Sequence, residues 1–123
     1  MHYWTVAEAR AFLPRLRDLL AAVQRVVAPG VQVRGNGKGR VSGGAGSGPA
    51  DAEADARAAM AELEEAGIVV RDPTVGLVDF PALGSDGVVY LLCFRLDDDD
   101  LAWWHLPEEG FSGRRPLPLP DDI

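Results

Sequence analysis

The chain has 123 residues, which is the usual size of one domain, so we expect a single domain over residues 1–123. Apolar residues make up 47% and charged residues 25%, a composition that excludes a wholly disordered or collagen-like chain. No apolar run is long enough to cross a bilayer, and no basic and apolar leader opens the sequence. The single cysteine, Cys93, excludes an internal disulfide. We therefore expect a cytoplasmic protein that does not contact membranes.

The net charge of −7 is unevenly distributed along the chain. Residues 1–50 carry seven Lys and Arg against two Asp and Glu, whereas residues 51–123 carry five against seventeen. The basic half could contact phosphates, but the acidic half cancels its field in a compact fold. Two oppositely charged segments that pack together explain the pattern better, and we expect no nucleic-acid partner.

Residues 5–28 are predicted to form an amphipathic helix. Thr5 and Glu8 match a capping box, in which each side chain satisfies a backbone N–H of the first turn. Apolar residues then recur at alternating spacings of three and four, and a flanking row widens the stripe. The apolar positions are Val6, Ala9, Phe12, Leu13, Leu16, Leu19, Leu20, Val23, Val26 and Val27. Because this stripe is the widest in the chain, we expect this helix to lie against a sheet.

A glycine-rich segment of about residues 29–49 follows the first helix. Residues 28–49 hold eight glycines and no periodic apolar pattern. Glycine-rich backbone can cradle a phosphate, but no strand precedes this segment and its spacing matches no Walker or dinucleotide loop. We predict a flexible linker between two helices.

A second helix is predicted over about residues 50–66. Its apolar face is small and alanine-rich, with Ala52, Ala56, Ala59, Leu63 and Ala66 at helical spacing. Gly67 marks its end. Its acidic side would meet the arginines of the first helix in an antiparallel hairpin, although exposed ion pairs contribute only ~0–1 kcal/mol each.

Residues 68–106 are predicted to form a β-meander. The expected strands are Ile68–Arg71, Leu77–Phe80, Val88–Leu96 and Leu101–Leu106. Short turns between them favour antiparallel pairing. The predicted fold is therefore α+β, with an N-terminal antiparallel helical hairpin packed on one face of a four-stranded antiparallel β-meander. The Pro-rich tail, residues 114–123, is expected to be extended and without a pairing strand.

Six short sequence pieces, at the N-terminus and in the C-terminal half of the chain, stand in a characteristic order. They are Thr5–Ala9, Leu13–Pro14, Gly76–Ala82, Val89–Leu91 with Cys93, Trp104–His105 and Gly110–Arg114. Together they resemble the bacterial family called domain of unknown function 2203, over the whole chain except the glycine-rich segment. That resemblance implies no established activity, cofactor or catalytic residue. The chain departs from the family pattern at Phe94–Asp98, where an aromatic and basic stretch followed by Gly-Glu is expected.

Asp79 is the first candidate for chemistry because it interrupts an apolar strand. A buried carboxylate needs a partner, and His105, Arg95 and Arg114 are the candidates. An Asp79–His105 pair could act as a general base, and an arginine beside it could hold an anionic substrate. The same pair could equally pin a strand in place, and both interpretations stay open. The binding candidates are Arg95, Arg114 and Trp104.

Cys93 and His105 could form a thiolate–imidazole pair or half of a metal site. We predict that Asp97–Asp100 form a four-residue turn, and the register that follows pairs Cys93 with Trp104. Because neighbouring side chains alternate, Cys93 and His105 then point to opposite faces unless a bulge intervenes. We therefore expect a structural Cys93, no metal and no cofactor.

The predicted strand Val88–Leu96 is apolar on both faces, and a helical hairpin covers only one of them. The second row, with Leu91, Cys93 and Trp104, would be an exposed apolar patch that soluble monomers rarely tolerate. We expect a homodimer through this face, because closed two-fold pairing is the commonest solution. A Pro-rich tail that folds back over the patch is the alternative.

Two classes of function are consistent with the sequence. No strong catalytic motif is present, which favours a small non-catalytic dimeric binding or assembly module. The alternative is a small-molecule or metal-dependent enzyme with a site built from Asp79, His105 and Arg114. Convergence of these three residues around a concave pocket would favour the enzyme.

Overall fold

The computed structural model describes residues 2–27 and 49–119 of the chain. The predicted linker at residues 29–49 lies outside the described residues, except that Pro49 opens the second helix. The end of the predicted tail, residues 120–123, also lies outside them. In the part of the chain that is described, no helix is long and apolar enough to cross a membrane.

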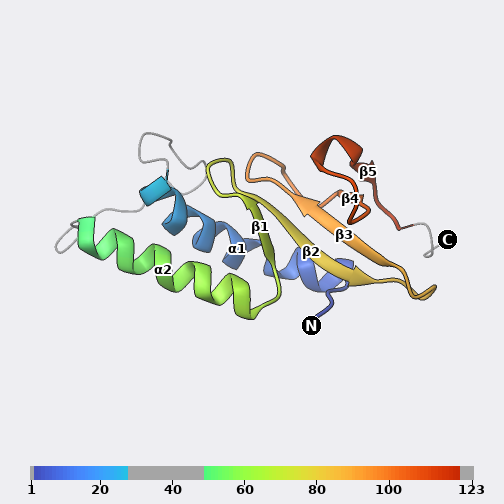
Figure 1. Ribbon diagram of the computed structural model, residues 1–123, viewed down its shortest axis with the longest axis horizontal. Helices are drawn as coiled ribbons and strands as arrows, with labels where there is room; N and C mark the ends of the chain where they lie inside the picture. Colours follow the sequence, from blue (N-terminus) through green and yellow to red (C-terminus); the bar gives the residue numbers. More distant parts are fainter. Residues whose placement is uncertain (1, 28–48, 120–123) are drawn as a thin grey trace.

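Two helices precede an antiparallel sheet, which confirms the predicted α+β fold (Figure 1). The helices are α1 (Val6–Val27) and α2 (Pro49–Glu65). The strands are β1 (Val69–Asp72), β2 (Leu77–Leu83), β3 (Val89–Phe94), β4 (Trp103–His105) and β5 (Arg115–Pro116), and a 3-10 turn, η1 (Phe111–Gly113), lies before β5. The strands pair in the order β1-β2-β3-β4-β5, so the sheet has five strands instead of the four predicted.

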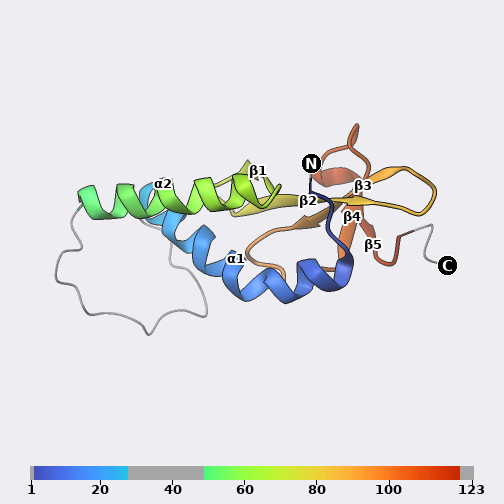
Figure 2. The ribbon, with the colours of Figure 1, turned by 90° about the horizontal axis from the view of Figure 1, so that it is seen from below.

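One face of the sheet, the helix face, packs on α1 (Figure 2). Alternate residues of β2 and β3, such as Phe80 and Leu92, are fully buried there with Leu16 and Leu20 of α1. The predicted capping box is present, because Thr5 N–H donates to Glu8 at 3.1 Å and Glu8 N–H donates to the Thr5 hydroxyl at 3.0 Å. The wide apolar stripe of α1 is therefore the main cover of the sheet, as predicted.

Helix α2 packs mainly on α1 and buries less of its own surface. Its buried apolar side chains are Ala59 and Leu63. On the exposed side of the hairpin, Arg15 of α1 donates to both carboxylate oxygens of Glu62 at 2.9 and 2.6 Å. The opposite charges of the two helices thus meet as predicted, in a pair that solvent screens.

The register between β3 and β4 differs from the prediction by one residue. Cys93 lies opposite Trp103, not opposite Trp104. The reason is the connection after Phe94, which is longer than a four-residue turn. Asp98 N–H donates to the Arg95 carbonyl at 2.8 Å, and the Asp98 carboxylate accepts the Arg95 N–H at 2.9 Å. This turn ends the strand early, and Cys93 and His105 therefore share a face of the sheet.

The prediction that the Pro-rich tail has no pairing strand is wrong. Arg115 lies opposite Trp104, and Leu117 N–H donates to the Ala102 carbonyl at 2.9 Å. Strand β5 is the edge of the sheet, so the proline in it removes no interior ladder hydrogen bond. Leu119 follows with only 5% of its surface exposed, and its burial in the core holds the tail on the sheet.

The second face of the sheet, opposite α1, is covered by the chain itself. We call it the site face; its residues include Asp79, Leu91, Cys93 and His105, all of them buried. The segment after β4 lies over it (Figure 2). Trp104 lies instead on the helix face, with its ring edge-on to Tyr90 at 5.3 Å. The exposed patch inferred from the sequence is thus absent from the described residues, and the homodimer stays a prediction that light scattering can test.

Candidate functional site

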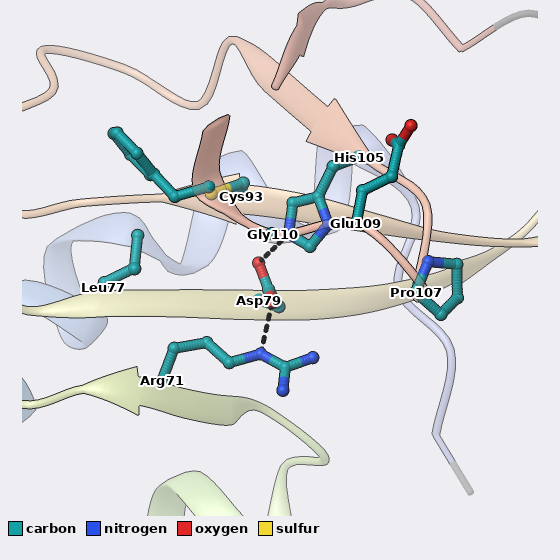
Figure 3. A pocket seen from close by; sticks show the side chains of 9 residues that line it. Arg71, Leu77, Asp79, Cys93, His105, Pro107, Glu109 and Gly110 are labelled. Atoms are coloured by element: carbon teal, nitrogen blue, oxygen red, sulfur yellow. Dashed lines mark hydrogen bonds and ion pairs between the residues drawn. The ribbon is translucent and has the colours of Figure 1, made fainter. Parts of the chain in front are cut away.

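A cavity of about 230 Å³ lies over the site face (Figure 3). Its floor is formed by side chains of β2, β3 and β4, and its opposite wall by the segment between β4 and η1. The lining residues are Arg71, Leu77, Asp79, Cys93, His105, Pro107, Glu109, Gly110 and Phe111. Three of the floor residues are buried polar or ionisable groups, which is unusual for the middle of a small sheet.

Asp79 is at the centre of this floor, in the middle of β2, with 1% of its side chain exposed. Its Oδ2 accepts a hydrogen bond from Arg71 Nε at 2.7 Å, and its Oδ1 lies 3.0 Å from His105 Nε2. The expected Asp79–His105 contact is confirmed. The carboxylate is therefore held from both sides, by a cation and by an imidazole, as a buried charge requires.

His105 has both ring nitrogens engaged within the fold. Its Nδ1 lies 2.8 Å from the Leu106 carbonyl, which can only accept, so Nδ1 carries a proton and donates it. Nε2 and Asp79 Oδ1 then share one further proton at 3.0 Å. No ring nitrogen is left free to take a proton from a substrate. In this geometry the two contacts of His105 join Asp79 to the Leu106 backbone.

Cys93 lies directly opposite Asp79 in the β2–β3 ladder. Burial, followed by the charge of Asp79, raises the pKa of its thiol from 9.0 to about 12. At neutral pH the sulfur therefore keeps its proton and is a poor nucleophile. One ligand atom from each of Asp79, Cys93 and His105 lies within 4.8 Å of the other two. These three side chains are therefore close enough together to hold a metal ion.

Arg71 is the site residue that the sequence interpretation missed. It lies on β1 at the bulge where the register with β2 shifts between Val70 and Asp72, and its Nε donates to Asp79 Oδ2. The guanidinium is half exposed, in contrast to the carboxylate that it binds. The sequence does indicate this contact, because a hairpin through the Asp72–Gly76 turn puts Arg71 and Asp79 on the same face of neighbouring strands.

The predicted binding residues Arg95, Arg114 and Trp104 do not line the cavity. Arg114 pairs with Asp98 at 2.5 Å instead of reaching Asp79. Its guanidinium lies 4.5 Å from the ring centre of Phe111, and that of Arg95 lies 4.9 Å from the same ring. Because Phe111 lines the cavity, the two arginines position part of its wall. Trp104 is on the helix face and donates to the Pro116 carbonyl at 3.2 Å.

Glu109 places a second carboxylate in the cavity wall, opposite the floor. Its Oε1 accepts the Leu106 N–H at 3.1 Å, and Arg115 donates to both oxygens. The hydrogen bond from Arg115 is the main reason why the pKa of Glu109 is lowered from its ordinary value. Leu106, whose carbonyl accepts the hydrogen bond of His105 Nδ1, is thus itself fixed by Glu109.

The family model described as "Uncharacterized conserved protein (DUF2203)" matches residues 2–117 of the chain. The match includes both helices, all five strands and every residue that lines the cavity. No curated protein and no solved structure matches the chain.

Proposed function

This chain belongs to the DUF2203 family, and we propose that it is a non-catalytic binding module whose ligand occupies the cavity over the site face. One observation carries this proposal. The polar groups on the cavity floor are hydrogen-bonded to one another, and they also line a cavity that a ligand can occupy. Such an arrangement supplies recognition without a free acid, base or nucleophile.

The geometry gives little support to catalysis by His105, Cys93 or Arg114. Both nitrogens of His105 are engaged, and the Cys93 thiol is protonated at neutral pH. Arg114, the expected anion holder of an enzyme site, is bound to Asp98. Catalysis by these side chains alone, without a metal ion, would need at least one of them to face a substrate.

The size of the cavity limits the ligand. Pockets for drug-sized molecules have volumes of roughly 300–1,000 Å³. The cavity here is about 230 Å³, and both its floor and its wall carry polar groups, such as Asp79 and Glu109, among apolar ones. We therefore expect an ion or a small polar molecule with few heavy atoms, and not a nucleotide, a peptide or a lipid.

Thermal-shift screening of small polar molecules and metal ions tests the proposal, with each hit mapped on the amide ¹H–¹⁵N spectrum. We expect perturbed amides at Leu77, Cys93 and Gly110, which line the cavity, and none in α2. Arg71→Gln removes the cation that binds the Asp79 carboxylate. It should therefore reduce the rise in melting temperature that a bound ligand produces. A screen without hits, or hits that perturb only amides far from the cavity, would contradict the proposal.

A further inference from the structure

We propose that the ligand of the cavity is a divalent transition-metal ion such as Zn²⁺, bound by Asp79 Oδ1, Cys93 Sγ and His105 Nε2. This inference rests on the proposed binding function and names its ligand. It replaces the expectation from the sequence that no metal is bound, because that expectation depended on the wrong register between β3 and β4.

The topology of the sheet brings the three residues together from three strands. Asp79 and Cys93 are direct cross-strand partners in β2 and β3. His105 lies opposite Leu91, two residues from Cys93 on the same face of β3. The site is therefore built on neighbouring strands of a sheet, which position side chains more rigidly than loops do.

The separations of the three ligand atoms are comparable with those in a metal site. The three ligand atoms all lie within 4.8 Å of one another, and Nε2 is 3.0 Å from Oδ1. Bond lengths of Zn²⁺ to nitrogen, oxygen and sulfur place neighbouring ligand atoms of a tetrahedron roughly 3.3–3.6 Å apart. To reach that spacing, Asp79 Oδ1 and His105 Nε2 would move slightly apart, and any separation near the 4.8 Å limit would shorten.

The hydrogen bonds around the trio orient two of the ligands for a cation. With Nδ1 donating to the Leu106 carbonyl, the Nε2 lone pair points at Asp79 Oδ1. Two acceptor atoms at 3.0 Å need a positive species between them, and a metal ion can take the place of the shared proton. Arg71 binds Oδ2 and leaves Oδ1 available. Outer hydrogen bonds of this kind are typical of metal-binding histidines and carboxylates.

The chemistry of the donors selects the class of ion. One thiolate, one imidazole and one carboxylate suit Zn²⁺ and its neighbours in the first transition row, whereas Mg²⁺ and Ca²⁺ prefer oxygen ligands alone. Metal coordination also deprotonates a thiol. With three protein ligands, a tetrahedral ion keeps one position for water or for a small molecule in the cavity.

Titration of the metal-free protein with Co²⁺ alone tests the inference by absorption spectroscopy, and Zn²⁺ then competes for the same site. Co²⁺ bound to sulfur gives a near-ultraviolet charge-transfer band. Because Cys93 is the only cysteine in the sequence, this band in the wild type reports its coordination directly. We expect one equivalent of Co²⁺ with that band, and displacement by Zn²⁺.

Variants locate the other ligands. Cys93→Ser should abolish the charge-transfer band, and His105→Gln should weaken Co²⁺ binding by about a hundredfold or more, since even outer-sphere changes cost 10–100-fold. His2→Gln is the matched control, because His2 is the only other histidine and does not line the cavity. It should leave the affinity unchanged. Circular dichroism verifies that each variant is folded.

The outcomes separate this inference from the proposed function. A wild-type protein that binds neither Co²⁺ nor Zn²⁺, or that binds Co²⁺ without the charge-transfer band, overturns the metal site. If a small polar molecule then still perturbs amides around the cavity, the binding function stands without the metal. If no ligand of either kind perturbs them, both proposals fail.

Discussion

The helix face and the site face of the sheet are built from alternate residues of the same strands, yet they are stabilised differently. On the helix face, Val78, Phe80 and Leu92 are buried in apolar contacts below α1. On the site face, Asp79 and His105 are buried in hydrogen bonds beside a cavity. Apolar burial supplies stability, whereas a buried polar network needs each of its partners in place. The helix face therefore supplies most of the folding stability, and the site face holds polar groups beside the cavity in which we propose that a ligand binds.

The largest expected effect comes from the helix face. Phe80→Ala removes a fully buried ring that lies edge-on to Trp4 at 5.1 Å. We expect a loss of about 3–5 kcal/mol in the free energy of unfolding, because the transfer energy and the cavity left behind add together. Urea denaturation measures it. A loss below that of any site-face variant would contradict the division between the faces.

A smaller loss is expected from the site face. Asp79→Ala leaves His105 and Arg71 without their common partner and should cost about 1–3 kcal/mol in the free energy of unfolding. Asp79→Asn preserves the shape of the side chain and should cost less. Chemical denaturation of both variants measures these losses. An Asp79→Ala protein with unchanged stability and unchanged ligand binding would show that the carboxylate contributes to neither.

The pKa of Cys93 gives the site face a dependence on pH. Because burial raises the thiol pKa from 9.0 to about 12, the unfolded chain loses this proton first as the pH rises. The contribution of the thiol to stability is complete below pH 9 and is lost between pH 9 and about 12. Of this contribution, about 1.4 kcal/mol is already lost at pH 10. Cys93→Ala should remove this part of the pH dependence, and a wild type and variant with parallel stability curves would contradict it.

The smallest effect is expected on the exposed surface of the helical hairpin. Glu62→Gln breaks an ion pair with Arg15 in which both side chains are well exposed. Solvent screening leaves such pairs little influence on stability, so we expect a melting temperature within experimental error of the wild type. A decrease like that of Asp79→Ala would show that the hairpin and the site are coupled.

Much of the helix face could be predicted from the sequence. The period of the apolar stripe in α1 and the Thr5–Glu8 capping box depend on local spacing, and both are confirmed. The fold class follows from the order of two helices and several short strands. These features are visible in one segment of the chain at a time.

The site face was harder to predict because it depends on pairing between segments. The Asp79–His105 contact was expected, since a buried carboxylate needs a partner. The meeting of Cys93 and His105 was missed, because the Arg95–Asp98 turn moved the register by one residue. Such a shift changes the face of every side chain in β4. The β1 bulge at Arg71 likewise leaves no local pattern, although the Asp72–Gly76 hairpin already puts Arg71 on the face of Asp79.

The most direct test of the site face is ¹⁵N NMR of the imidazole rings in histidine-labelled protein. The sequence has two histidines, so His2 serves as the internal control. We predict that His105 Nδ1 carries a slowly exchanging proton, bonded to the Leu106 carbonyl, and that Zn²⁺ shifts the Nε2 resonance of His105 and leaves His2 unchanged. A His105 ring protonated at Nε2 alone, with exchange as fast as that of His2 and no response to Zn²⁺, would contradict both the Nδ1 hydrogen bond and the metal site.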